Sequence, residues 1–135
     1  MHRHYSWVRI HTTKSLFSSP NVGRVIMTSD EVDVIVGSDH QIFSIHKQLL
    51  ALYSRYFKGL FVDKPEPEIF SVHLLGIEAC FFVEFNHWLY TGKCMEYLLG
   101  PWNAGVRAAS LVELWKLGNF LEAPAFQNQC MRELM

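Results

Sequence analysis

Asp33 and Lys47 are oppositely charged residues of this 135-residue chain, and Asp33 stands within an apolar stretch. Val32 and Val34 flank Asp33, so the sequence predicts a partly buried carboxylate. A buried charge is normally paired or hydrogen-bonded, because removing it from water without a partner is costly. We therefore expect Asp33 to be satisfied by Lys47 or by backbone N–H groups, in an arrangement that contributes more to fold specificity than to stability.

Patterns typical of catalysis are missing from the sequence. It contains no Gly-x-Ser-x-Gly elbow, no Cys–His pairing signature, no phosphate-binding glycine loop and no His-Glu-x-x-His. Glu66 and Glu68 come nearest to an acid/base pair, but the adjacent prolines predict a solvated loop. The sequence therefore predicts a protein that is not an enzyme and that needs no cofactor.

The histidines do not have the spacing of a metal site. His46 stands alone between an expected strand and an expected helix, where a hydrogen-bonded structural role is far more common than metal binding. His2, His4 and His11 are loosely spaced near the start of the chain. We expect no bound metal.

The three cysteines favour free thiols in a reducing compartment. Cys80, Cys94 and Cys130 are odd in number and widely separated, with no close pair of the kind that binds metal. Cys80 and Cys130 stand in apolar helical patterns and are expected to be small core residues. No apolar run approaches the roughly 18 residues of a membrane span. We expect a cytoplasmic or nuclear protein with no membrane partner.

A strand hairpin followed by a helical hairpin must position these residues. Val32–Val36 and Gln41–Ile45 alternate in a way that predicts two strands, joined by a turn at residues 37–40. Ser54 separates two helical segments and is expected to cap the second at its N-terminus. The two predicted helices are Lys47–Tyr53 and Arg55–Phe61.

Further along the chain, apolar spacing predicts one more strand and three helices. The longest of these helices carries apolar residues around most of its circumference, which indicates a buried helix. Recurring Gly and Pro predict an irregular connection after it. In chain order, the expected elements are a strand at Ile69–Leu74, a helix at Ile77–Tyr90, a connection at Lys93–Val106, and helices at Ala108–Leu117 and Ala125–Leu134.

Residues 1–29 differ in charge from the rest of the chain. They hold four basic residues and no acidic one, whereas residues 30–135 hold eight basic and thirteen acidic residues. This composition predicts a mobile basic arm. A cleavable mitochondrial transit peptide is an alternative, because such peptides are also rich in Arg and Ser and poor in acids. The acidic body argues against nucleic-acid binding by the domain itself.

Several short motifs follow one another in a fixed order. They are Asp33-Val34, Phe43-x-x-His46-Lys47, Leu49-Leu50, Ser54-x-Tyr56-Phe57, Leu60-Phe61 and Tyr90-Thr91-Gly92. This order resembles the BTB/POZ domain family over about residues 30–135. The segments Leu114–Gly118 and Phe126–Asn128 are similar to the closing helical pair of the short BTB proteins common in fungi.

The resemblance implies an α+β fold with a small, mainly three-stranded sheet flanked by helical hairpins. It also implies a protein–protein interaction module that forms homo- or hetero-dimers with other BTB domains. In dimeric relatives, Asp33 and Lys47 match positions that line a charged, partner-binding groove. The alternative is that Asp33 and Lys47 form a purely structural pair, and we favour this structural interpretation. Val22–Met27 is the candidate for the N-terminal strand that such relatives exchange with their partner.

Two more specific functions are compatible with the resemblance. One is an adaptor for a cullin-type ubiquitin ligase, in which the helical hairpin would dock the scaffold through Tyr56, Phe57 and Phe61. Residues 61–64 then stand where many such adaptors carry an apolar-x-Glu motif, although this chain has Asp63 and no Glu. The other function is a stand-alone dimerisation partner that modulates longer BTB proteins, including transcription factors.

Overall fold

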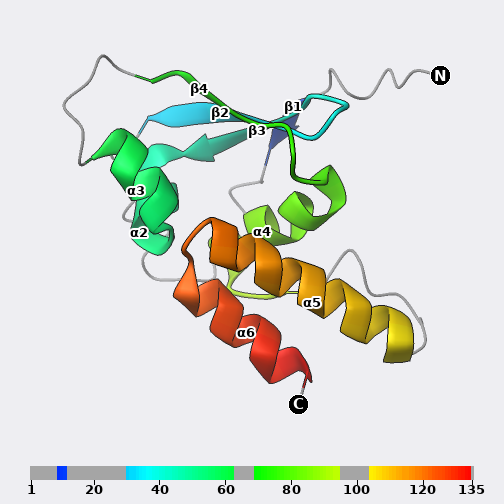
Figure 1. Ribbon diagram of the computed structural model, residues 1–135. Helices are drawn as coiled ribbons and strands as arrows, with labels where there is room; N and C mark the ends of the chain where they lie inside the picture. Colours follow the sequence, from blue (N-terminus) through cyan, green and yellow to red (C-terminus); the bar gives the residue numbers. More distant parts are fainter. Residues whose placement is uncertain (1–8, 12–29, 63–68, 95–103, 135) are drawn as a thin grey trace.

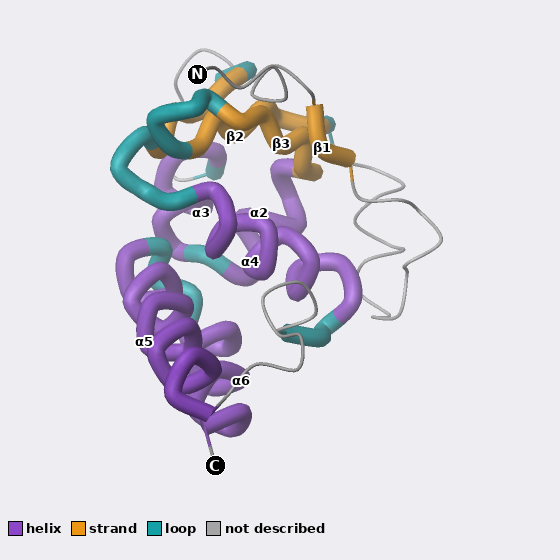
Figure 2. Tube along the Cα trace, turned by 90° about the vertical axis from the view of Figure 1, so that its right-hand side faces the viewer, coloured by secondary structure: helices purple, strands orange, loops and turns teal. Residues whose placement is uncertain are grey.

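The computed structural model describes residues 9–11, 30–62, 69–94 and 104–134. In these residues, four strands form one sheet in the order β1-β3-β2-β4, and helices cover one of its faces (Figures 1 and 2). Strands β2 and β3 are antiparallel, whereas β1 pairs with β3 and β4 pairs with β2 in parallel. The strands are β1 (Arg9–His11), β2 (Glu31–Val36), β3 (Gln41–His46) and β4 (Ser71–Leu74).

The β2–β3 hairpin follows from its alternating side chains and its turn. Val32 and Val34 are buried in the core. Gly37 adopts a φ of 80°, a conformation that glycine takes without steric cost. A Cβ atom at this position would also lie 3.2 Å from the carbonyl oxygen of Ile77. The N–H of His40 donates to the carbonyl of Gly37 at 3.0 Å and closes the turn.

Ser54 joins the first helical hairpin to the C-terminal helices. Its hydroxyl accepts a hydrogen bond from the N–H of Phe57 at 3.2 Å and donates one to the carbonyl of Leu121 at 2.6 Å. The predicted helix cap is therefore confirmed. No helix in the described ranges is long and apolar enough to cross a membrane. The helices are α2 (Lys47–Tyr53), α3 (Arg55–Phe61), α4 (Ala79–Thr91), α5 (Ala104–Phe120) and α6 (Pro124–Leu134).

Helix α4 lies at the centre of the core and joins the sheet to the C-terminal helices. Phe82 packs edge-on against Phe43 of β3, with ring centroids 4.9 Å apart. Further along α4, the rings of Phe85 and Trp88 contact Phe126 of α6 at 5.1 and 5.2 Å. The expectation that this helix is buried is confirmed, and so is the α+β fold.

Several elements differ from the sequence predictions at their ends. Helix α4 starts at Ala79 and not at Ile77, because Glu78 is still extended, with φ −76° and ψ 131°. Helix α5 already starts at Ala104, so the last residues of the predicted irregular connection are helical. The central part of that connection, residues 95–103, lies outside the described residues.

The segment predicted to be a mobile arm contributes a short strand. Arg9–His11 form β1, with Ile10 in register with Phe43 of β3, so the sheet has a fourth strand beside the three expected. Three residues carry too little alternation to reveal a strand, and it is pairing with the edge of β3 that defines this one. The rest of the arm, including the exchange candidate Val22–Met27, lies outside the described residues.

Gly118 allows close packing of α5 on α6. A Cβ atom on Gly118 would lie 2.8 Å from Cγ of Gln127 and 3.1 Å from Cδ2 of Phe126. We expect Gly118→Ala to lower the free energy of unfolding by about 1–3 kcal/mol, because the core would be overpacked. Urea unfolding measures this change.

Gly59→Ala is the matched control. Nothing lies within 4 Å of a Cβ atom on Gly59, which is inside α3. Alanine favours a helix interior over glycine by about 0.5–1 kcal/mol, so this variant should be at least as stable as the wild type. Equal stability of the Gly118→Ala variant and the wild type would contradict the close packing.

Candidate functional site

Lys47, the first residue of α2, lies beside two aromatic rings from different elements. Its ammonium nitrogen is 5.7 Å from the ring centre of Phe61, at the end of α3, and 5.8 Å from that of Phe70, just before β4. The side chain of Phe70 is 71% exposed. A cation over such a ring contributes about 0.5–1 kcal/mol at an exposed site. The structure thus brings together Lys47 and Phe61, which the sequence analysis assigned to separate sites.

Asp33 is half-buried on β2, and Ser44 is a partner of its carboxylate. The hydroxyl of Ser44 donates to Oδ1 of Asp33 at 3.0 Å, and the two residues are opposite each other in the β2–β3 register. The backbone N–H of Asp33 donates to the carbonyl of Phe70 at 3.1 Å. Asp33 and Lys47 therefore both contact Phe70. The sequence analysis missed Ser44, because strand pairing is what places it beside Asp33.

The three aromatic candidates of the helical hairpin differ in exposure. Phe57 is fully buried, with Tyr56 packed edge-on against it at 5.2 Å and Phe61 stacked on it at 5.8 Å. Tyr56 and Phe61 are half-buried and lie near opposite ends of α3. Phe57 is therefore a core residue that supports the other two rings and presents no surface of its own.

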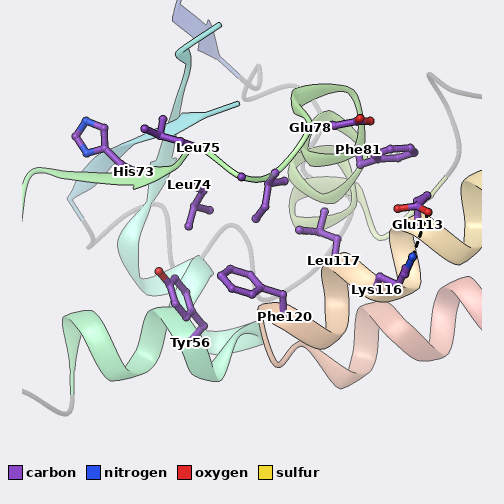
Figure 3. Close-up of a pocket in the computed structure, with 12 residues that line it drawn as sticks. Tyr56, His73, Leu74, Leu75, Glu78, Phe81, Glu113, Lys116, Leu117 and Phe120 are labelled. Atoms are coloured by element: carbon purple, nitrogen blue, oxygen red, sulfur yellow. Dashed lines mark hydrogen bonds and ion pairs between the residues drawn. The ribbon is translucent and has the colours of Figure 1, made fainter. Parts of the chain in front are cut away.

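A cavity of about 570 Å³ lies beside Tyr56 (Figure 3). Its wall comes from α3, from the end of β4 and the segment that joins it to α4, and from α4 and α5. The rings of Tyr56 and Phe120 lie 5.2 Å apart on one side of it. Phe120 is 50% exposed and Leu75 is 47% exposed. The apolar lining consists mainly of Tyr56, Leu75, Ile77, Phe81, Leu117 and Phe120.

Polar side chains also line this cavity. Lys116 and Glu113 form an ion pair of 3.4 Å along α5, as Figure 3 shows. His73 and Glu78 contribute polar groups from the β4–α4 side. The sequence analysis found Tyr56 but missed the cavity, because the other residues of its wall come from elements far apart in the chain.

A buried hydrogen-bonded group joins α4 to β3. The hydroxyl oxygen of Tyr90 accepts the backbone N–H of His46 at 3.2 Å and lies 2.7 Å from Nδ1 of the same residue. A ring proton on Nε2, the nitrogen that faces the carboxylate of Glu31, leaves Nδ1 as the acceptor of the Tyr90 hydroxyl proton. Nε2 of His46 then faces the carboxylate of Glu31 at 3.7 Å. The structural role expected for His46 is confirmed.

The environment of Tyr90 keeps its phenol neutral. Burial raises the pKa of Tyr90 to about 12, and the negative charge of Glu31 adds to this rise, while the backbone N–H of His46 lowers the pKa in part. The neutral hydroxyl can therefore both accept and donate.

The cysteines are distributed differently from the sequence expectation. Cys94 and Cys130 are both buried, and a hydrogen bond between the thiols raises the pKa of Cys94 and lowers that of Cys130. Cys80 is exposed and is not the core residue that was expected, because it lies on the solvent side of the first turn of α4. In the part of the chain that is described, no cluster of three potential metal ligands is found.

Tyr90→Phe removes a hydroxyl that accepts and donates within the core. We expect its free energy of unfolding near neutral pH to be about 1–3 kcal/mol lower than that of the wild type, because the N–H of His46 loses its partner. Tyr53→Phe is the control, since the half-buried ring of Tyr53 keeps its edge-on contact with Trp88 at 5.1 Å. Urea unfolding of both variants measures the difference.

The stabilities of the wild type and of Tyr90→Phe should depend differently on pH. The pKa of Tyr90 is about 12 in the folded state against 10.0 for an ordinary tyrosine. The folded state therefore favours the protonated phenol. The stability that this preference contributes is complete below pH 10 and is lost as the pH rises to about 12. The stability gap between the wild type and Tyr90→Phe should narrow by roughly 2 kcal/mol over this range. If the difference in stability between the two proteins stayed constant over this pH range, the raised pKa of Tyr90 would be contradicted.

Comparison with known proteins gives a family and two related folds. The family described as BTB/POZ domain matches residues 26–135. The BTB domain of human gigaxonin is 15% identical, with a TM-score of 0.58 over 83% of this chain and 82% of that one. The BTB domain of zebrafish PATZ1 is 21% identical, with a TM-score of 0.59 over 84% of this chain and 85% of that one. No curated protein sequence matches the chain.

Proposed function

Because the chain belongs to the BTB/POZ domain family, we propose that it is a protein-binding adaptor that docks a cullin-type scaffold between α3 and α5. BTB/POZ domains are in general protein–protein interaction modules and not enzymes. The observation that carries the proposal is the cavity beside Tyr56, whose wall includes partly exposed apolar side chains. The loop after α3, which holds Asp63, lies outside the described residues.

The residues of this cavity have the properties of binding anchors. Contacts between proteins concentrate in a few aromatic and aliphatic side chains near the centre of the interface. Phe120 and Leu75 each keep about half of their surface in water, at 50% and 47% exposure. Covering that half contributes roughly 1 kcal/mol for each side chain. Tyr56 packs against Phe120 and holds its ring in place.

The polar residues around the cavity also suit a protein partner. An interface typically has an apolar centre and a polar rim that stays in contact with water. Glu78, Glu113 and Lys116 supply charges of both signs around the apolar residues. Such a mixed rim favours orientation of a partner more than strong electrostatic attraction.

A second candidate function is stand-alone dimerisation with another BTB domain. It is favoured by the aromatic pair that flanks Lys47, because Phe70 is 71% exposed and Phe61 is half-buried. If a partner covered the exposed ring of Phe70, the ring would gain apolar contact and could keep its interaction with the ammonium group of Lys47. Asp33 would support this surface through its backbone bond to Phe70.

Phe120→Glu tests the adaptor proposal. We expect calorimetric titration with a purified cullin N-terminal domain to show a Kd of about 1 μM for the wild type, equivalent to about −8 kcal/mol. The variant should bind at least about tenfold more weakly, because a carboxylate would replace the apolar anchor.

Val112→Glu is the control for this experiment. Val112 lies on the same helix, is 47% exposed and is not part of the cavity wall. Retained binding by this variant shows that a negative charge on α5 does not by itself prevent docking. Failure of the folded wild type to bind any cullin N-terminal domain would refute the adaptor proposal and leave the dimerisation function.

A further inference from the structure

The open edge of strand β4 borders the cavity beside Tyr56. Strand β4 is the last strand in the sheet order, and among the described residues only β2 pairs with it. His73 and Leu74 belong both to this strand and to the wall of the cavity. In Figure 3, Leu74 points across the cavity toward the rings of Tyr56 and Phe120. The edge of the sheet and the cavity therefore form one continuous surface.

The pairing of β4 with β2 shows which backbone groups point to the open edge. The carbonyls of Phe70 and Leu74 accept hydrogen bonds from N–H groups on the β2 side, at 3.1 and 3.0 Å. In a parallel pair, every second residue of a strand bonds to the same neighbour. The backbone N–H and C=O groups of Ser71 and His73 therefore point away from β2. Residues 70–77 contain no proline, Lys, Arg, Asp or Glu, the residues that usually protect such an edge.

We propose that this surface binds an extended segment of a partner protein, which adds a strand to β4 and places apolar side chains over the cavity. Backbone N–H and C=O groups along an open edge recognise another backbone in the extended conformation, a mode of binding called β-augmentation. The inference rests on the proposed function in one respect, because both place a protein partner at the same cavity. It adds the conformation of that partner and the sequence pattern that the cavity accepts.

The side chains of β4 determine this sequence pattern. Val72 and Leu74 are buried against the helices, whereas Ser71 and His73 are exposed. Side chains that lie opposite each other on adjacent strands share a face of the sheet. The two partner residues opposite Val72 and Leu74, which are separated by one residue, therefore face the helices and the cavity. We expect an apolar residue at both positions, because the lining of the cavity is mainly apolar.

The charges around the cavity favour a basic segment. Glu78 and Glu113 outnumber Lys116 among the acidic and basic residues of the lining, and residues 30–135 hold thirteen acidic against eight basic residues. A negative surface of this kind attracts a positively charged partner. A second copy of β4 supplies no such charge, because residues 71–74 contain no Lys or Arg. The partner segment thus has apolar residues at alternate positions and at least one Lys or Arg.

Peptide selection tests this sequence pattern. A random library of short peptides is selected against the folded full chain, and the recovered peptides are titrated by calorimetry. We expect apolar residues at positions i and i+2 together with a basic residue, and at least about tenfold weaker binding to His73→Pro than to the wild type. Proline removes an outward N–H and is tolerated on an edge strand, so the bonds to β2 remain. His73→Ala is the control, because it keeps this N–H.

Several results would overturn the proposal. They are the recovery of no peptide above background, the recovery of peptides without the alternating pattern, and equal binding to His73→Pro and His73→Ala. Phe120→Glu should weaken binding of the same peptides, because it places a carboxylate in the apolar wall of the cavity. Weaker binding to Phe120→Glu but not to His73→Pro would leave the cavity as a docking site and refute the added strand. Binding of the peptides without binding of a cullin N-terminal domain would refute only the adaptor function.

Hydrogen exchange tests the added strand without any substitution. The amide protons of Ser71 and His73 should exchange rapidly in the free chain, because they point away from β2. Binding of a selected peptide should slow their exchange by at least about tenfold, since both amides then take part in a strand pair. Unchanged exchange in the complex would overturn the proposal.

Slow exchange of these two amide protons in the free chain would also overturn the proposal, because another strand would already occupy the edge. Its dependence on protein concentration identifies that strand. Protection that is lost on dilution indicates a second copy of the chain, and protection that persists indicates a segment of the same chain.

Discussion

Burial of α4 between the sheet and the C-terminal helices is the constraint on which the rest of the structure depends. Phe82 contacts the sheet through Phe43, while Phe85 and Trp88 contact Phe126 of α6. Aromatic pairs in such geometries contribute about 0.5–1.5 kcal/mol beyond the area that they bury. Because these rings contact the sheet at one end of α4 and α6 at the other, α4 sets the distance between the sheet and the C-terminal helices.

The candidate binding surface is a consequence of this arrangement. Ser54 caps α3 and donates to Leu121, so α3 is held against the end of α5. This contact places Tyr56 beside Phe120, and the segment between β4 and α4 completes the cavity. The apolar residues at the surface are thus fixed by hydrogen bonds and core rings beneath them. A partner would meet a largely preformed site, which lowers the entropic cost of binding.

Polar groups on the sheet form hydrogen bonds with nearby residues, and these bonds fix how the strands pair. Asp33 accepts from Ser44, and the phenol of Tyr90 serves both the backbone and the ring of His46. Buried polar groups with partners specify one register, because any slip would leave them without hydrogen bonds. The same register leaves the second edge of β4 without a partner strand among the described residues and places Phe70 beside Lys47. The buried polar contacts and the exposed position of Phe70 therefore both depend on the same strand pairing.

The sequence by itself determined the family and the positions of most elements. Alternation marked β2 and β3, the position of Ser54 predicted the helix cap, and apolar residues around most of the circumference of one helix marked α4 as buried. These features follow from backbone geometry over a few residues. Tertiary structure alone decided that Phe57 is buried while Tyr56 stays accessible, that Phe120 completes the cavity, and that Arg9–His11 pair with β3. Such contacts join residues far apart in the chain, and they depend on how whole elements pack, which no local pattern encodes.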